Sequence, residues 1–162
     1  MRNEPATHVA HLDRRAVLAG TVALGAMGAS GVPARADYVD DGDPREAIAY
    51  ISNGRTVTPA RVKLTLPELA ENGNVVSLTV EVESAMTATD YVKTIHIIAS
   101  QNPLAIVARF HLGPRSGRAR VQSNIRLATT QTVTALAEMS DGALFSGTST
   151  VLVTLSACID GG

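Results

Sequence analysis

The sequence predicts an all-β fold of two packed layers with about seven strands, a short helix before them and a mobile tail after them. Three observations predict this class. Beyond residue 60 apolar and polar residues alternate, turn-forming pairs such as Asn72-Gly73 and Asp141-Gly142 separate the alternating runs, and the runs recur at short spacing. This pattern is typical of an immunoglobulin-like β-sandwich. Beyond residue 36 the chain has neither a glycine-rich phosphate loop nor a longer internal repeat, which argues against a nucleotide-binding enzyme.

A short helix is predicted over residues 44–51. Ala47, Ile48 and Ile51 share one face at helical spacing. Pro44 suits the first turn of a helix, and Asn53-Gly54 supplies the stop.

Alternating runs after this helix have the period of two that is expected of half-buried strands. Val76, Leu78 and Val80, for example, alternate with polar residues, so one side of the strand faces a core and the other faces water. The predicted strands cover residues 62–66, 76–83, 92–99, 106–111, 119–127, 132–138 and 144–155.

Composition excludes several functional classes. The chain has 162 residues, a formal net charge of −1, 45% hydrophobic and 18% charged residues, which is ordinary for one compact domain. It is unlike a disordered tail or a basic protein that binds nucleic acid. Aromatic residues make up only 3%, so no stacking surface for bases or sugar rings is expected and the core must be aliphatic. The single cysteine excludes an internal disulfide and a cysteine-rich metal cluster.

Residues 1–36 are predicted to be a cleaved export signal. Arg14 and Arg15 precede a weakly apolar run, and Ala34-Arg35-Ala36 has the small-x-small pattern of a cleavage site. Glycines make the run too weakly hydrophobic for a convincing anchor, so no membrane association is expected after cleavage. The paired arginines indicate twin-arginine export to the periplasm, which favours a chain that folds with a partner first. A retained anchor or an ordinary N-terminal helix is the alternative.

Candidate catalytic residues are few. His96 and His111 each lie in a predicted strand without a second ligand at metal-binding spacing. Both are interpreted as ordinary sheet histidines unless separate strands bring them together, and no metal site is predicted. The basic loop with Arg115, Arg118 and Arg120 fits either a site for an anionic group or a solvated turn between strands.

The only cysteine follows the last predicted strand, on a tail that spans residues 156–162. Its members are Ser156, Ala157, Cys158, Ile159, Asp160, Gly161 and Gly162. Position alone leaves two interpretations open. The thiol is incidental, or it is a covalent tether that accepts a sulfur group and presents it to a succession of enzymes.

Four long stretches carry a family resemblance. They are LPELAENGN (66–74), MTATDYVKTIHIIA (86–99), NPLAIVARFHLGPRSGRARV (102–121) and IRLATTQTVTALAEMSDG (125–142). Together they resemble the SoxY family, the sulfur-carrier subunits of the periplasmic thiosulfate-oxidising Sox system. The resemblance divides the chain into an export signal (1–36), a SoxY-type sandwich (37–155) and a flexible carrier tail (156–162).

This resemblance implies a carrier that is not itself an enzyme and has no metal or other cofactor of its own. Cys158 would be the residue to which sulfur is attached. The partner would be a SoxZ-like subunit, in a heterodimer or heterotetramer. Transient contacts are expected with a haem enzyme that couples thiosulfate to the thiol, a dimanganese hydrolase that releases sulfate and a sulfane dehydrogenase.

The tail departs from the family pattern, in which glycines typically flank the cysteine as GGCGG. Here Ala157 and Ile159 flank Cys158, and Asp160 adds a negative charge. Bulk and charge at these positions should hinder entry into a narrow channel that accepts an anionic adduct. Two alternatives therefore stand beside the standard carrier: a divergent SoxY-like paralogue for another sulfur donor or enzyme set, and a β-sandwich interaction module with an incidental cysteine.

Overall fold

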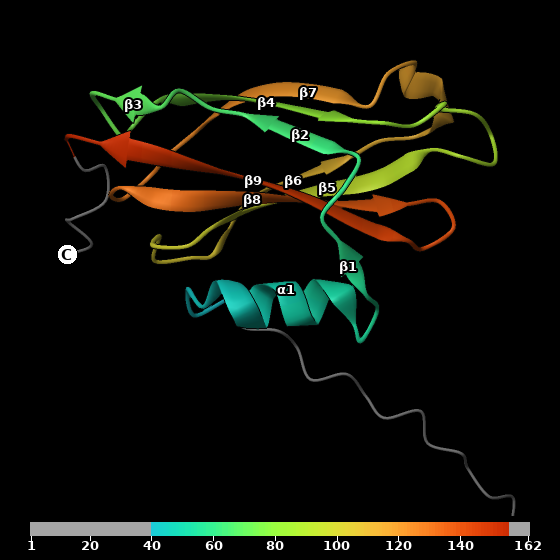
Figure 1. Ribbon diagram of the computed structural model, residues 1–162, viewed down its shortest axis with the longest axis horizontal. Coiled ribbons are helices and arrows are strands. Elements are labelled where there is room, and N and C mark those ends of the chain that lie inside the picture. The colour runs from blue at the N-terminus through green and yellow to red at the C-terminus, as the bar shows by residue number, and fades with distance from the viewer. Residues whose placement is uncertain (1–39, 156–162) are drawn as a thin grey trace, which may run out of the picture. The chain divides into compact units, whose positions relative to one another are not determined.

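Two β-sheets stack face to face, and helix α1 lies against the outer side of the larger sheet (Figure 1). The structure, a computed structural model, describes residues 40–155. In chain order the elements are α1 (Pro44–Ser52), β1 (Val57–Thr58), β2 (Val62–Thr65), β3 (Leu69–Ala70), β4 (Val76–Val82), β5 (Val92–Ala99), β6 (Ile106–His111), the 3₁₀ helix η1 (Pro114–Ser116), β7 (Arg120–Ile125), β8 (Gln131–Met139) and β9 (Leu144–Val153). The predicted all-β sandwich with a short helix ahead of it is confirmed.

The larger sheet has the strand order β1-β9-β8-β5-β6, and β3 also pairs with β9. Strands β5, β6, β8 and β9 form antiparallel pairs, with Ile95 opposite Ala137 between β5 and β8. The two short strands run parallel to β9, β1 beside its start and β3 beside its end. The smaller sheet is antiparallel, in the order β2-β4-β7.

Aliphatic side chains fill most of the space between the sheets, as the low content of aromatic residues predicts, and Phe110 and Phe145 pack against this core. Leu78 and Val80 of β4 share this core with Ile95 and Ile97 of β5, and all four are at most 2% exposed. Burial of one such side chain contributes roughly 1.5 to 3 kcal/mol to folding. Valines and alanines of β8 complete the core: Val133, Ala135 and Ala137.

Local signals in the sequence set both ends of α1. The carboxylate of Asp43 accepts a hydrogen bond from the backbone N–H of Arg45 at 2.7 Å, which caps the N-terminus. Pro44 occupies the first turn, where its missing N–H has no cost. Asn53 ends the helix in the left-handed conformation, with φ 50°. The predicted helix is confirmed, and it ends at Ser52, one residue after the predicted end.

The apolar face of α1 packs on the outer side of the larger sheet. Ala47 and Ile51 form a second core with Ile98, Leu136 and Leu144. Strand β5 is therefore buried on both of its faces over most of its length, because the sandwich core lies on one side and α1 on the other.

All seven predicted strands are present, with ends that differ from the prediction by at most two residues. Strands β1 and β3 were not predicted, because two residues are too short to show a period. The predicted signal (1–36) and the predicted mobile tail (156–162) lie outside the described residues. Within residues 40–155, no helix is long and apolar enough to cross a bilayer.

Candidate functional site

The C-terminal end of β9 is held from both sides up to the last described residue. On one side, the backbone N–H of Leu152 and of Thr154 donate to carbonyl groups of β3 and its neighbours at 2.9 and 3.1 Å. On the other side, the N–H of Val153 donates to the hydroxyl of Thr130 at 2.9 Å. The carbonyl of Leu155 then accepts from the N–H of Gly73 at 2.8 Å. The chain is thus fixed three residues before Cys158.

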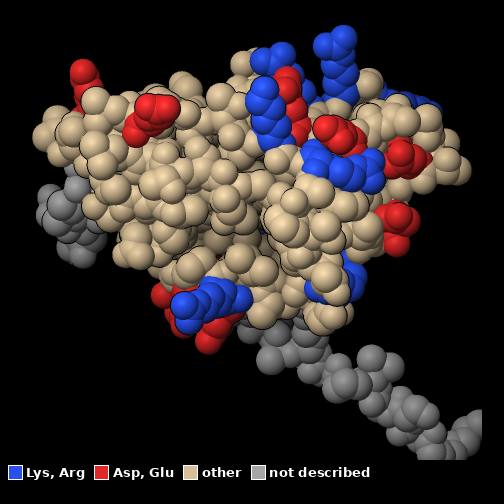
Figure 2. Space-filling view, viewed as in Figure 1, with Lys and Arg blue, Asp and Glu red and all other residues tan. Residues whose placement is uncertain are grey.

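Exposed apolar side chains surround this point. Leu69 of β3 lies beside Leu152 of β9 in parallel register, and the two are 51% and 54% exposed. Val75 and Leu155 are more exposed still. The charged side chains that Figure 2 shows at its left end, where β3 and the end of β9 lie, are acidic, and the exposed glutamates Glu68 and Glu71 lie on either side of β3. The surface around the start of the tail therefore combines exposed apolar side chains with carboxylates.

The predicted sulfur-attachment residue, Cys158, lies outside the described residues. The same holds for the other tail positions and for Arg14 and Arg15 of the predicted export signal. The structure therefore describes the base of the predicted site and not the thiol.

The two histidines lie on one face of the larger sheet, on neighbouring strands. Thr94 of β5 is opposite His111 of β6, and His96 is opposite Arg109, which places the two rings diagonally across the ladder. His96 is 9% exposed, and its Nδ1 has no hydrogen-bond partner among the described residues. His111 Nδ1 lies 3.2 Å from the Thr94 hydroxyl. No cluster of three metal-ligating side chains occurs in residues 40–155.

Charge and burial keep His96 neutral. Desolvation by burial, the neighbouring Arg109 and, to a smaller extent, His111 lower the pKa of His96 to about 4, against an opposing effect of Glu138. A neutral, sheltered imidazole at neutral pH fits a structural role in the sheet, as the sequence predicted.

Glu138 of β8 is the centre of an ionic cluster on the same face. Arg55 Nη1 donates to its Oε1 at 2.9 Å, and Lys93 Nζ lies 3.8 Å from the same oxygen. Partial burial raises the pKa of Glu138, but the hydrogen bond and charge of Arg55, with the charge of Lys93, outweigh it and leave the pKa lowered. Arg55 also donates to carbonyl groups of Ile51 and Ser52, so this cluster ties the end of α1 to the sheet.

The basic loop lies at the opposite end of the sandwich from Leu155, between β6 and β7. Arg120 Nε is 3.2 Å from Glu81 Oε1 in the adjacent strand, and both side chains are about half exposed. Arg115 belongs to η1, and Arg118 follows it. The structure does not bring these arginines to the base of the predicted carrier tail.

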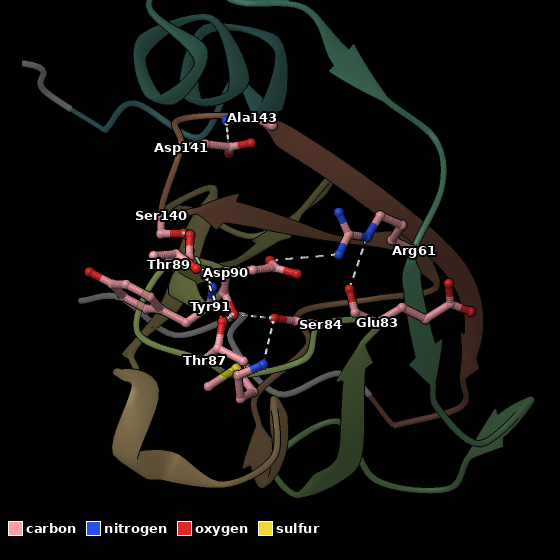
Figure 3. Close-up of polar contacts among 11 residues, drawn as sticks. Arg61, Glu83, Ser84, Thr87, Thr89, Asp90, Tyr91, Ser140, Asp141 and Ala143 are labelled. Carbon is pink, nitrogen blue, oxygen red and sulfur yellow. Dashed lines mark hydrogen bonds and ion pairs between the residues drawn. The ribbon is translucent and has the colours of Figure 1, made fainter.

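A polar network that sequence reasoning missed also lies at this far end (Figure 3). The hydroxyl of Ser140 donates to the carbonyl of Thr89 at 2.9 Å and accepts from the N–H of Tyr91 at 3.2 Å. Arg61 Nε donates to the Glu83 carbonyl at 2.9 Å, and its guanidinium lies over the Phe145 ring. These bonds order the loop between β4 and β5, which we interpret as a structural network.

An apolar groove lies along β6 and the end of β7, and sequence reasoning missed it as well. Its volume is about 470 Å³, and it is lined by Asn102, Pro103, Leu104, Ile106, Val107, Ala108, Asn124, Ile125 and Arg126. The only local signal was an uneven charge distribution, because residues 100–131 contain arginines and no acidic residue.

A comparison with protein families gives a match that covers more than half of the chain. The family model described as "Sulfur oxidation protein SoxY" matches residues 48–158. No match was found among curated proteins.

Comparison with solved structures supports the same assignment. The sulfur carrier protein SoxY from Chlorobium limicola f thiosulfatophilum matches with a TM-score of 0.57 and 26% identity, over 68% of this chain and 96% of that one. A superoxide reductase (neelaredoxin) from Ignicoccus hospitalis matches with a TM-score of 0.51 and 15% identity, over 58% of this chain and 80% of that one. At this identity the second match shows a shared fold and nothing more.

Proposed function

The chain belongs to the SoxY family, whose members are sulfur carriers rather than catalysts, and we propose that it holds sulfur intermediates covalently on Cys158. The observation that supports this most is that the family match extends to residue 158, the position of the chain's only cysteine. The alternative of an interaction module with an incidental thiol gives no reason for a family match that extends to this residue.

The described structure supports a tethered thiol. Hydrogen bonds fix the backbone at Leu155, which precedes Cys158 by three residues in the sequence. Exposed apolar side chains surround this point, and the exposed glutamates Glu68 and Glu71 lie on either side of β3. The sandwich therefore serves as a rigid base, and the tail presents the thiol to other enzymes.

The proposed chemistry has two steps, both carried out by partner enzymes. In the first, the Cys158 sulfur bonds to the terminal sulfur of thiosulfate; the thiol proton goes to water and two electrons go to a haem protein. In the second, water attacks the sulfonate sulfur and the bond from this sulfur to the neighbouring sulfur breaks. Sulfate is released and a persulfide stays on Cys158; one proton of the water goes to the outer sulfur of the persulfide and the other goes to solvent. We propose that a dimanganese hydrolase catalyses this step and that a sulfane dehydrogenase oxidises the remaining sulfur.

The proposed setting is the periplasm, with a SoxZ-like subunit as the permanent partner. Residues 1–36 would direct twin-arginine export of the folded pair. Replacement of Arg14 and Arg15 by lysine should leave full-length precursor in the cytoplasm, whereas Arg35→Lys, which alters the variable position of the cleavage motif, should not.

The test of the carrier function is the intact mass of the chain, purified with its partner from thiosulfate-fed cells without reductant. We expect a sulfur-containing mass increase on the C-terminal peptide that dithiothreitol removes. Cys158→Ser should lose the increase and keep the fold and partner binding. A bare thiol in the wild-type chain under these conditions would contradict the proposal.

The altered tail favours one second candidate, a paralogue that serves another sulfur donor or enzyme set. Ile159 and Asp160 stand where glycines are typical of the family. Substitution of Ala157, Ile159 and Asp160 by glycine should then speed turnover of the loaded carrier by a standard Sox hydrolase. Equal rates before and after the substitution would contradict a steric effect of the tail.

A further inference from the structure

The groove along β6 and β7 has no function in the carrier chemistry described above. We propose that this groove, together with the arginines of residues 100–131, is the surface on which the partner subunit docks. The partner's chemistry follows from the surface: a folded protein that places apolar side chains in the groove and carboxylates opposite the arginines. This inference rests on the proposed function, because it assumes that the chain works with a permanent partner.

The groove lies on the side of the sandwich where each sheet ends in an edge strand. Among the strands of residues 40–155, β6 pairs only with β5 and β7 pairs only with β4, so each has one edge without a strand partner. On the opposite side, β1 and β3 cover parts of β9, and β2 packs close against it. Unpaired edges invite association with another chain, so natural proteins usually cover them. The open side is thus the part of the described sandwich that most needs a partner.

Apolar side chains in the groove supply an anchor. Leu104 is 57% exposed at its rim, and Ile106 and Val107 of β6 are only half-buried. Ile125, at the end of β7, also lines the groove and is almost fully buried. Interfaces draw most of their binding energy from a few such anchors that fill apolar pockets.

The uneven charge distribution indicates what charge the partner's surface carries. Residues 100–131 contain five arginines and no acidic residue, whereas the other described residues contain five Lys or Arg against eleven Asp or Glu. Arg120 is paired with Glu81, but no salt bridge within residues 40–155 joins the other four: Arg109, Arg115, Arg118 and Arg126. Complementary charge steers association and suppresses wrong partners, so an acidic surface fits here.

The same charges argue against a second copy of this chain. A symmetric dimer through the groove would bring the two sets of arginines face to face, which costs free energy. A head-to-tail contact with the acidic side of another copy would not close into a dimer. A different, acidic subunit avoids both problems.

The partner is expected to contact side chains of this surface rather than to add a strand to the edge of β6. Ala108 is opposite Ile97, and Ile106 is opposite Ile98, so Val107 is an extra residue in β6. Such a bulge twists the edge and interrupts regular pairing. The nine groove residues are also fewer than the roughly 20 to 30 per side of a standard interface, so the contact must extend from the groove along β6 and β7 toward the arginines at the other end of β7.

The test is the affinity of the mature chain for the SoxZ-type subunit of its own organism, measured by isothermal titration calorimetry. Leu104→Glu and Arg126→Glu should each weaken binding at least about tenfold, because each removes an attractive contact and adds a repulsive charge. The matched controls are Leu152→Glu, at a leucine equally exposed on the closed side, and Arg45→Glu on α1. Both controls should bind within about twofold of the wild-type chain, and circular dichroism should show the same fold for all four variants.

The outcomes separate this inference from the proposed function. Weaker binding of Leu152→Glu with unchanged binding of Leu104→Glu would overturn the docking surface, while an adduct on Cys158 would still support the carrier. Absence of binding by the wild-type chain would refute the permanent partner, and this inference with it. Dissociation of a homodimer by Leu104→Glu, seen by sedimentation of the chain alone, would identify the groove as a self-contact and overturn the proposal.

Discussion

The two long sides of the sandwich are built differently. On the β2–β9 side the sheets approach so closely that an added Cβ at Gly147 would collide with the carbonyl oxygen of Val62. Strands β1 and β3 cover the two ends of β9 there. On the β6–β7 side each edge strand has one edge without a partner among the described strands, and an apolar groove of about 470 Å³ lies between the two strands.

This difference indicates that the two sides of the sandwich serve different purposes. The closed side leads directly to Leu155, so it holds the base from which the carrier tail begins. The open side offers apolar and positively charged surface that the chain does not cover itself. Under the proposed function, the closed side would present the thiol from a rigid base and the open side would hold the partner. The following changes test whether the two sides differ as described.

The largest effect is expected from Gly147→Ala, which breaks the closed side. The added methyl group has no space against the Val62 backbone, so β2 and β9 must separate. We expect a loss of about 3 kcal/mol in the free energy of unfolding, measured by urea denaturation. Gly113→Ala is the matched control, because an added Cβ there meets nothing within 4 Å. A cost for Gly147→Ala as small as that of the control would contradict the close approach of the sheets.

The second largest effect is the pH dependence of the free energy of unfolding, which we expect to depend on a histidine of β5, the strand next to β6. His96 of β5 faces Arg109 of β6, and its pKa is lowered to about 4 from an ordinary value of 6.5. Between pH 6.5 and 4.5 the unfolded chain therefore binds more protons at this position than the folded chain does, so stability falls as the pH falls. We expect a loss of roughly 2 kcal/mol over this range.

Urea titrations at several pH values measure this dependence. His96→Leu should remove most of the slope between pH 6.5 and 4.5, whereas His111→Gln should keep it. The titrations stop at pH 4.5 so that Glu138 stays ionised in the folded chain. The pKa of Glu138 is lowered from its ordinary value of 4.5, so its ion pair with Arg55 is lost only at a lower pH. An unchanged slope in His96→Leu would show that another group causes the acid sensitivity.

The smallest effect is expected at the start of the open edge. The Asp40 carboxylate accepts hydrogen bonds from the backbone N–H groups of Ala105 and Ile106, both at 2.8 Å. Asp40→Ala should cost about 1 kcal/mol and speed hydrogen exchange at these two amides. Asp41→Ala, which removes an exposed bond to Asp43, should leave both amides unchanged. Unchanged exchange in Asp40→Ala would mean that this carboxylate does not fix the start of β6.

The longer elements could be predicted from the sequence because their signals are local. The alternation of Val76, Leu78 and Val80 predicts β4, and Asp141-Gly142 predicts the turn between β8 and β9, where Gly142 has φ 88°. The short strands β1 and β3 depend on pairing with β9, some 80 residues further on, and have no local period. The same limit applies to the groove, whose walls come from separate parts of the chain.

The candidate site divides in the same way. Position and family resemblance predict Cys158 as the attachment residue, and this stays a prediction because Cys158 lies outside the described residues. His96 and His111 were interpreted as sheet residues, but their diagonal neighbourhood and the unpartnered Nδ1 of His96 required the strand register.

The sequence by itself determined the seven longer strands, the helix ends, the mainly aliphatic core and the family, because each depends on residue type at short spacing. Only the tertiary structure decided that α1 covers the outer face of the larger sheet, that β1 and β3 flank β9, and that the side formed by β6 and β7 stays open. These features are contacts between distant segments. Such contacts depend on which surfaces meet when the chain folds, and the local periodicity of the sequence does not specify which surfaces these are.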